Sequence, residues 1–238
     1  SMPLQNLYQL LYNTPADRLK NVEIMYSAPA KYHVNGAVIN VILKTPSPLD
    51  GLQGQFRAGY NQAHYGSYGT ALAATYAAKD WIFDLNYGLS RTKSWKQEET
   101  QSNHLLNGKR TLIEDQMRRI NRNWSNTIFA SASYKTLKLN YNGQITSDSK
   151  SQSLSSGSLG HFTNTYRMLS PVNYHKVALR YTAPFGMAVG GDYTRYYEYR
   201  SQSLFKESEY LFGSGNKQEI NRYHIYIDQQ HQLGKWQL

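Results

Sequence analysis

The segment from Trp81 to Ser90 alternates between large apolar and small polar side chains. Its odd positions hold Trp, Phe, Leu, Tyr and Leu, whereas the even positions after Ile82 hold Asp, Asn, Gly and Ser. A period of two places these two sets on opposite faces of a β-strand. An apolar face with aromatic rings and a small polar face are typical of a strand that has lipid on one side and water on the other. The segment therefore predicts a membrane-type β-strand.

Similar alternation recurs from residue 51 onward and predicts a mainly β protein of antiparallel up-and-down strands. Tight turns are expected near residues 79, 135, 184 and 234, with long polar loops at 91–118, 147–160 and 201–218. Short turns at one end and long loops at the other are typical of outer-membrane β-barrels. About eight strands and a stub at Trp236 follow from this spacing, and we interpret them as part of a larger barrel. Aromatic residues that flank the tight turns are expected at a membrane interface: Tyr76, Trp81, Tyr134 and Tyr181.

The composition narrows the alternatives. Of 238 residues, 40% are hydrophobic and the mean hydropathy is −0.65, low for a chain with one large core, yet there are 21 Tyr. No apolar run approaches the ~20 residues of a membrane helix, so strands are the only spanning elements to expect. Cysteine is absent, which excludes disulfides and thiolate metal sites. The formal charge is +10, but the basic residues are dispersed and no nucleic-acid-binding motif occurs, so no nucleic-acid partner is expected.

Residues 1–48 have a different pattern and predict a small α+β segment. Leucines at positions 4, 7, 10 and 11 have helical spacing, and Asn13-Thr14-Pro15 would end that helix. Short strands are expected at 22–25 and 38–43, with an Asn35-Gly36 turn before the second. Pro46 and Pro48 mark a boundary.

Three pieces of this segment occur in a recognisable order: Asn21-Val-Glu-Ile24, Pro29-Ala-Lys-Tyr32 and the run from Gly36 to Lys44. Together they resemble the end of the plug domain of TonB-dependent outer-membrane receptors. In that family an IEVI-type strand leads through a Pro-Ser/Ala-x-x-Tyr turn into a GIINIVLK-type strand. The turn after Gly36 is shorter here than is usual in the family.

The resemblance implies that residues 1–48 are the C-terminal part of a plug and that residues 49–238 begin the outer-membrane barrel. It also implies a place in the bacterial outer membrane, contact with its lipid, and uptake of a nutrient ligand. Energy would come from a TonB-type periplasmic coupling protein, through a segment that precedes residue 1. Siderophore, glycan and peptide importers share this architecture, so the ligand stays open.

No sequence motif for nucleophilic, zinc or nucleotide chemistry occurs, and we expect no enzyme activity, no cofactor and no metal site. The candidate site is instead the polar, lumen-facing side of the strands. Its residues would contact either the ligand or the plug, and both interpretations stay open. They are Gln53, Gln55, Arg57, Asp84, Asn86, Lys138, Asn140, Asn142, Arg180, Asp192 and Glu198.

Two other classes of protein fit parts of the pattern. Eight strands could close on themselves as a small outer-membrane barrel with a structural or adhesive role. The alternation would also suit a soluble ligand-binding β protein whose apolar face points inward.

Overall fold

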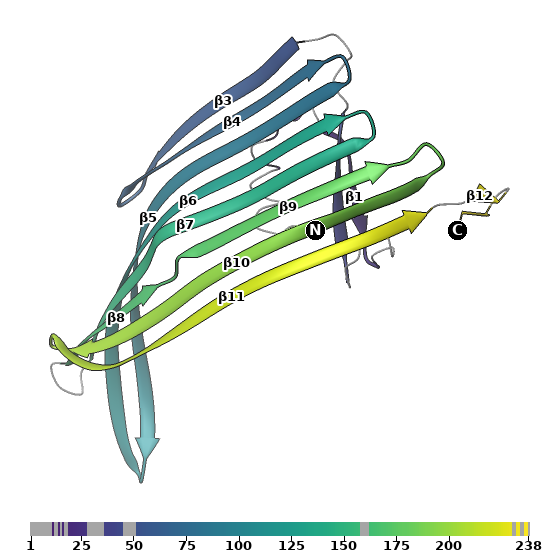
Figure 1. The fold of residues 1–238 in the computed structure, drawn as a ribbon. Coiled ribbons are helices and arrows are strands. Elements are labelled where there is room, and N and C mark those ends of the chain that lie inside the picture. Colours follow the sequence, from purple (N-terminus) through teal and green to yellow (C-terminus); the bar gives the residue numbers. More distant parts are fainter. Residues whose placement is uncertain are drawn as a thin grey trace.

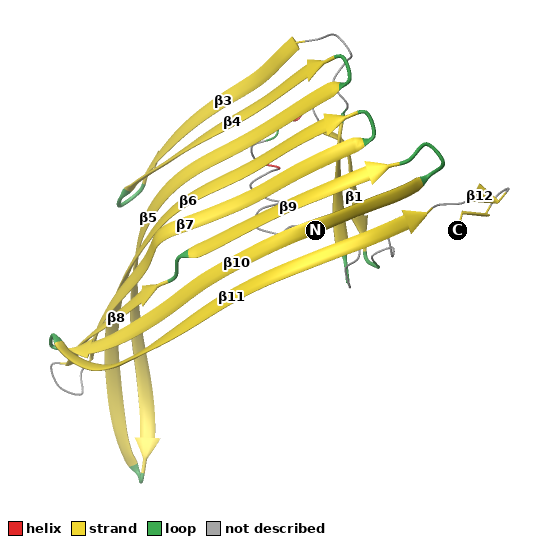
Figure 2. Cartoon of the chain, viewed as in Figure 1, coloured by secondary structure: helices red, strands yellow, loops and turns green. Residues whose placement is uncertain are grey.

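The computed structural model describes residues 11, 14, 16, 19–27, 36–44, 51–157, 162–229, 232–233 and 236–237. Nearly all of them lie in antiparallel strands, and one large sheet dominates (Figures 1 and 2). In chain order the strands are β1 Leu19–Met25, β2 Val38–Leu43, β3 Gly51–Gln62, β4 Gly66–Ala78, β5 Trp81–Leu106, β6 Lys109–Tyr134, β7 Leu137–Gly157, β8 Phe162–Leu169, β9 Val172–Thr182, β10 Met187–Lys206, β11 Glu209–Gln229, β12 Gln232–Leu233 and β13 Trp236–Gln237. The expectation of a mainly antiparallel β chain is confirmed.

The large sheet is an up-and-down arrangement in which neighbours in sequence are neighbours in space. Its strand order is β11-β10-β8-β7-β6-β5-β4-β3, and β9 also pairs with β7 and β10. Strands β8 and β9 thus share one position in the sheet and are separated by Ser170-Pro171. Proline has no N–H to donate to the ladder, which accounts for the interruption.

The sheet is open in the described part of the chain. Strands β3 and β11 form its two edges, and no pairing joins them. Figure 1 shows these two strands at opposite ends of a curved sheet. The described strands therefore do not close into the small eight-stranded barrel that one alternative required.

Tight turns join the strands at one end of the sheet, as the sequence predicts. Lys79 and Lys135 adopt φ values of 51° and 49°, and Gly186 has φ 88°. A left-handed conformation at Lys79 and Lys135 allows the two-residue connections of β4–β5 and β6–β7, and Gly186 ends the four-residue connection of β9–β10. The turn expected near residue 234 lies partly outside the described residues, where β12 pairs only with β13.

The three long loops predicted at the other end are wrong. The region 91–118 is continuous strand except for Asn107-Gly108, whose φ values of 50° and 76° fit a type I′ turn. Strand also fills most of 201–218, around a turn at Glu207-Ser208, and β7 extends to Gly157. Polar composition did not prevent strand formation, because cross-strand pairing satisfies the backbone. The long connections are therefore long hairpins, and the tip of β5–β6 projects beyond its neighbours (Figure 1).

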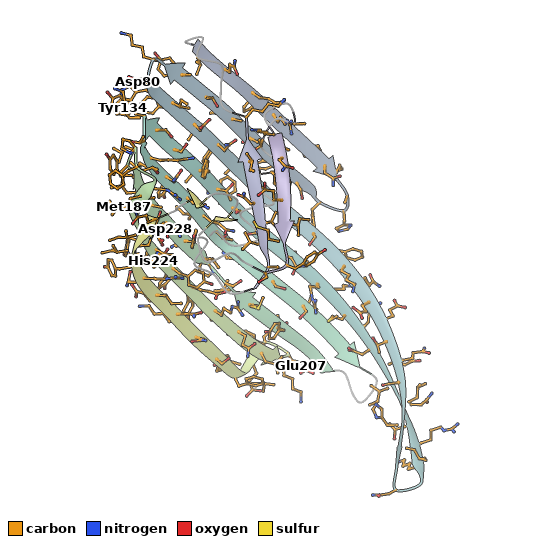
Figure 3. All side chains as sticks on the ribbon, turned by 90° about the vertical axis from the view of Figure 1, so that its right-hand side faces the viewer. Asp80, Tyr134, Met187, Glu207, His224 and Asp228 are labelled. Atoms are coloured by element: carbon orange, nitrogen blue, oxygen red, sulfur yellow. The ribbon has the colours of Figure 1, made fainter. Side chains whose placement is uncertain are left out.

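The N-terminal segment contributes one two-stranded hairpin to the described structure. Strands β1 and β2 pair in register from Asn21 opposite Ile42 to Met25 opposite Val38, as expected for the two short strands. Figure 3 shows this hairpin on the concave side of the large sheet. The helix expected near the N-terminus falls outside the described residues, apart from Leu11.

Burial in the large sheet is the reverse of that in a soluble sheet. Residues opposite each other in register share a face, and faces alternate along a strand, so Trp81, Phe83 and Leu85 define an apolar face and Asp84 a polar face. Large apolar side chains stay exposed on the apolar face: Phe56 is 67% and Leu179 is 49% exposed. The buried side chains of the large sheet lie on the polar face, whereas the buried Gly143 on the apolar face has none. They include Ala71, Ala73, Thr75, Asn86, Ser125, Ser131, Thr146, Tyr174, Ala188 and Glu198.

Curvature accounts for this difference. Side chains crowd together on the concave side of a bent sheet and spread apart on the convex side. Small residues such as Ala73 and Thr75 fit the crowded polar side, whereas the rings near Tyr134 point outward (Figure 3). No large side chain in the described residues is fully buried, so the sheet has no apolar core of its own.

Candidate functional site

All eleven residues predicted to line the lumen lie on the polar face of the sheet. The register places Gln53 opposite Thr75, Thr75 opposite Asp84, and Asp84 opposite Ser131. The same row continues through Asn140, Ala178, Asp192 and His224. A second row lies two residues farther from the tight turns and contains Gln55, Asn86, Asn142 and Lys176. Arg57 and Glu198 lie still farther from the tight turns. Lys138 and Arg180 lie opposite each other, nearer to the tight turns than either row.

Asp84 is held by two hydroxyl groups from the neighbouring strands. The Thr75 hydroxyl donates to Asp84 Oδ1 at 2.7 Å, and the Ser131 hydroxyl donates to Oδ2 at 3.3 Å. Thr75 and Ser131 are 3% and 8% exposed. The Asp84 carboxyl group is thus held from both sides in a fixed orientation, near the tight-turn end of the polar face.

Asp192 forms the centre of a charged group near the β11 edge. Lys176 Nζ lies 2.9 Å from Asp192 Oδ1, and His224 Nδ1 lies 3.2 Å from Oδ2. The side chains of Lys176 and Asp192 are 16% and 14% exposed, so this ion pair is screened less than a surface pair. The group joins β9, β10 and β11 across the polar face.

Glu198 lies in a third polar group, toward the long-hairpin end of the sheet. The Tyr196 hydroxyl donates to Glu198 Oε2 at 2.8 Å, and Arg200 Nε donates to Oε1 at 2.6 Å. Glu198 is 8% exposed. Both of its carboxylate oxygens therefore have a donor from the same strand.

Asn86 differs from these groups because its buried side-chain carbonyl oxygen has no hydrogen-bond partner within the part of the chain that the structure describes. The residue is 6% exposed and lies between Ala73 and Phe129. A buried acceptor without a donor costs about 1–3 kcal/mol. Its side-chain oxygen is thus a buried acceptor that no donor among the described residues satisfies.

The structure does not bring the candidate residues together in one compact site. Asp84 on β5 and Asp192 on β10 share a row but are separated by β6, β7 and β9. Four steps between strands correspond to about 19 Å. The polar face is consequently a broad surface with separate charged groups, suited to a large partner or to several small contacts.

The four aromatic residues assigned to an interface lie together at the tight-turn end, on the apolar face. The rings of Trp81 and Tyr134 have centroids 4.6 Å apart, and Trp81 stacks on Phe83 at 5.4 Å. Tyr76 stacks on Phe83 at 6.4 Å, and Tyr181 lies opposite Leu137. Tyr76, Trp81 and Tyr134 thus form one cluster with Phe83, and Leu137 separates Tyr181 from it.

Charges outside the alternating band follow ordinary surface electrostatics. In the tight turn after β6, the nearby Asp80 carboxylate raises the pKa of Lys135 above its usual value. In the long hairpin, side-chain hydrogen bonds from Gln116 and then Gln97 lower the pKa of Glu99. Both groups are exposed, so these pKa shifts reflect local contacts at the ends of hairpins and do not indicate a functional site.

Sequence reasoning missed the partners of the three carboxylates: Thr75, Ser131, Lys176, His224, Tyr196 and Arg200. The hairpin turns contained the signal for two of them. Counting outward from the Lys79 turn places Thr75 opposite Asp84. Counting from the Asn107-Gly108 turn places Ser131 opposite Asp84. The pairing of Asp192 with His224 depends on a bulge between Leu204 and Phe205, which no sequence pattern indicated.

No group of His, Asp or Glu able to hold a metal ion occurs within the described ranges. Nor does that part of the chain contain a helix long and apolar enough to cross a membrane. No family model, curated protein or solved structure matches the chain.

Proposed function

We propose that this chain is part of a TonB-dependent receptor of the bacterial outer membrane, which imports a nutrient ligand. The observation that carries the proposal is the reversed burial of the large sheet. Its convex face exposes large apolar and aromatic side chains, and its concave face buries small polar ones. A sheet in water would bury the apolar face, whereas lipid outside and a polar lumen inside account for both faces.

The height of the apolar face supports a membrane position. On β5 it extends from Trp81 to Leu89, and the first charged residue on that face is Arg91. The ten steps from Trp81 to Arg91 on a strand tilted by about 40° correspond to about 25 Å along the membrane normal. Outer-membrane barrels have an apolar band of about that height.

The open sheet supports a barrel wider than eight strands. A small barrel would join β3 to β11, but these strands are separate edges of the described sheet. Together with the β1–β2 hairpin on the concave side (Figure 3), this arrangement fits a lumen wide enough for a plug. The polar groups around Asp84, Asp192 and Glu198 would then contact the plug or the ligand.

Solubility and the encoding gene test the proposal. The chain should require detergent or lipid to stay dispersed, and a monodisperse protein in plain buffer would contradict a membrane position. The reading frame should encode further alternating strands that pair with both edges, and a plug with a coupling segment. A frame that encodes these 238 residues alone would contradict the receptor, while leaving a membrane sheet intact.

A further inference from the structure

Two cations lie directly opposite each other on the polar face of the large sheet. Lys138 of β7 pairs with Arg180 of β9. Side chains so placed have Cβ atoms about 5 Å apart, and like charges at that distance destabilise a sheet. Both side chains are exposed, and neither makes an ion pair or a side-chain hydrogen bond with any residue that the structure describes. An anion bound between them would remove the repulsion.

The register row that contains these two cations has no acidic residue. It crosses the whole sheet from β3 to β11 and consists of Gly51, Ala77, Ile82, Ser133, Lys138, Arg180, Gly190 and Tyr226. Ser133 lies next to Lys138 on β6, and Gly190 lies next to Arg180 on β10. The row therefore presents positive charge with a hydroxyl group on one side and an open position on the other.

The carboxylates of the neighbouring rows do not neutralise the two cations. Asp192 lies diagonally across from Arg180, but its two oxygens contact a lysine and a histidine. Asp84 lies two strands from Lys138, and Asp228 lies two strands from Arg180. Two strands correspond to about 10 Å. The positive charge between β7 and β9 is therefore left for an anion from elsewhere.

The N-terminal segment is not a suitable source of that anion. Residues 1–48 contain four basic residues and two acidic ones, which gives a net charge of 4 − 2 = +2. They are Arg18, Lys20, Lys31 and Lys44 against Asp17 and Glu23. A segment of like charge would add to the repulsion on average, so charge complementarity favours an exchangeable anion over this part of the chain.

The ring of Tyr226 bounds the site on the side of β10. Its phenol end occupies the place where a side chain of residue 190 would lie, so Gly190 leaves room for the ring beside Arg180. The same ring stacks on His224 with centroids 5.5 Å apart, and His224 contacts Asp192. The tyrosine therefore has a defined orientation next to the two cations.

We propose that Lys138 and Arg180, here called the cation pair, bind the phosphate group of a phosphorylated solute between Ser133 and the Tyr226 ring. The inference rests on the proposed function, in which the polar face contacts the ligand, and names the chemistry of that ligand. A phosphate monoester carries about −1.5 to −2 charges at pH 7, which matches two cations, whereas a carboxylate carries one. The planar guanidinium group fits two phosphate oxygens, and the ammonium group supplies a second positive charge.

Binding of inorganic phosphate to the full chain tests the cation pair. Equilibrium dialysis in neutral detergent, at a fixed ionic strength of about 0.1 M, would compare the wild type with the double variant Lys138→Gln, Arg180→Gln. We expect saturable binding by the wild type and an affinity at least roughly tenfold lower in the variant, because two charged donors are lost. Absence of saturable binding by the wild type would overturn the site.

The matched control removes the same charge at the far tip of β5–β6. The variant Lys109→Gln, Arg110→Gln lies 24 residues along β6 from Ser133, far beyond the Debye length of about 10 Å. It should bind phosphate within about twofold of the wild type. Equal weakening in the two double variants would mean that net charge alone attracts phosphate, and would overturn the site.

Thermal unfolding separates lost binding from misfolding. Without phosphate, Lys138→Gln should unfold at a temperature no lower than the wild type, because the like-charge repulsion is gone. A lower temperature would contradict the repulsion from which the inference starts. Added phosphate should raise the unfolding temperature of the wild type but not of the double variant, since a ligand of the folded state stabilises it. An equal rise in both would overturn the site.

Two further comparisons test the ligand class and separate the site from the receptor. Acetate, with one negative charge, should bind more weakly than phosphate, and equal affinity would overturn the assignment to phosphate. A chain that stays monodisperse in plain buffer and still binds phosphate through the cation pair would contradict the receptor and support the site. A chain that requires detergent and binds no phosphate would overturn the site alone.

Discussion

Replacing Leu85 by arginine should destabilise the protein in a bilayer far more than an arginine on the other face. Leu85 lies on the apolar face between Ala74 and Ala130. It follows Trp81 by four residues, which places it about 10 Å into an apolar band of about 25 Å and so close to the midplane. An arginine at that depth costs about 2–4 kcal/mol.

The matched control is Asn140→Arg. Asn140 is half-buried on the polar face, opposite Ser131 and Ala178, in the row that contains Asp84. An arginine there would face the polar lumen, and we expect a change within about 0.5 kcal/mol. Leu85→Ala would measure the part of the Leu85→Arg effect that comes only from lost apolar contacts.

Guanidinium unfolding in phosphatidylcholine vesicles, followed by tryptophan fluorescence, would give the three free energies. The reasoning expects a clear gap between Leu85→Arg and Asn140→Arg. Equal losses for the two arginines would refute the assignment of the two faces to lipid and water.

Other predictions concern local groups. Asp192→Ala should lower the free energy of unfolding by about 2–3 kcal/mol, because Lys176 loses its carboxylate partner in a weakly solvated place. Asp192→Asn should lower it less. A loss below about 0.5 kcal/mol for Asp192→Ala in the same unfolding assay would refute the stabilising role of the ion pair. Asp80→Asn should return the pKa of Lys135 toward its usual value in an NMR titration. The raised pKa means that this contact stabilises the fold at lower pH and fades as pH rises through that pKa, and an unchanged titration would count against the ion pair. Gly108→Val should speed amide hydrogen exchange at the β5–β6 tip, because a φ of 76° disfavours a β-branched residue. The midpoint of global unfolding should not change. Unchanged exchange at the tip would argue against the type I′ turn.

Much of the sheet could be predicted because side-chain alternation and turn chemistry are local signals. The strand at Trp81–Ser90 and the turns at Lys79 and Lys135 needed only a period of two and a short polar pair. The length of β5 and β6 was underestimated, because polar residues in 91–118 were interpreted as loop. Asn107-Gly108 is itself a strong hairpin signal, and giving it that weight would have predicted the long hairpin.

The charged groups were harder to predict than the faces, because they depend on register. Counting from the Glu207-Ser208 turn would place Asp192 opposite Tyr223, and the bulge at Leu204/Phe205 moves it opposite His224. A second bulge likewise brings Lys150 opposite Arg122. Bulges depend on the fit between two strands, so one strand's sequence does not reveal them.

Spin labels on single cysteines test the central claim most directly, and the chain has no native cysteine to interfere. Labels at Phe83, Leu85 and Tyr87 should be accessible to oxygen dissolved in the bilayer and shielded from a water-soluble nickel complex. Labels at Asp84 and Asn140 should show the opposite preference. Equal access of the nickel complex to all five positions would contradict a lipid-facing apolar surface, and with it the proposed receptor.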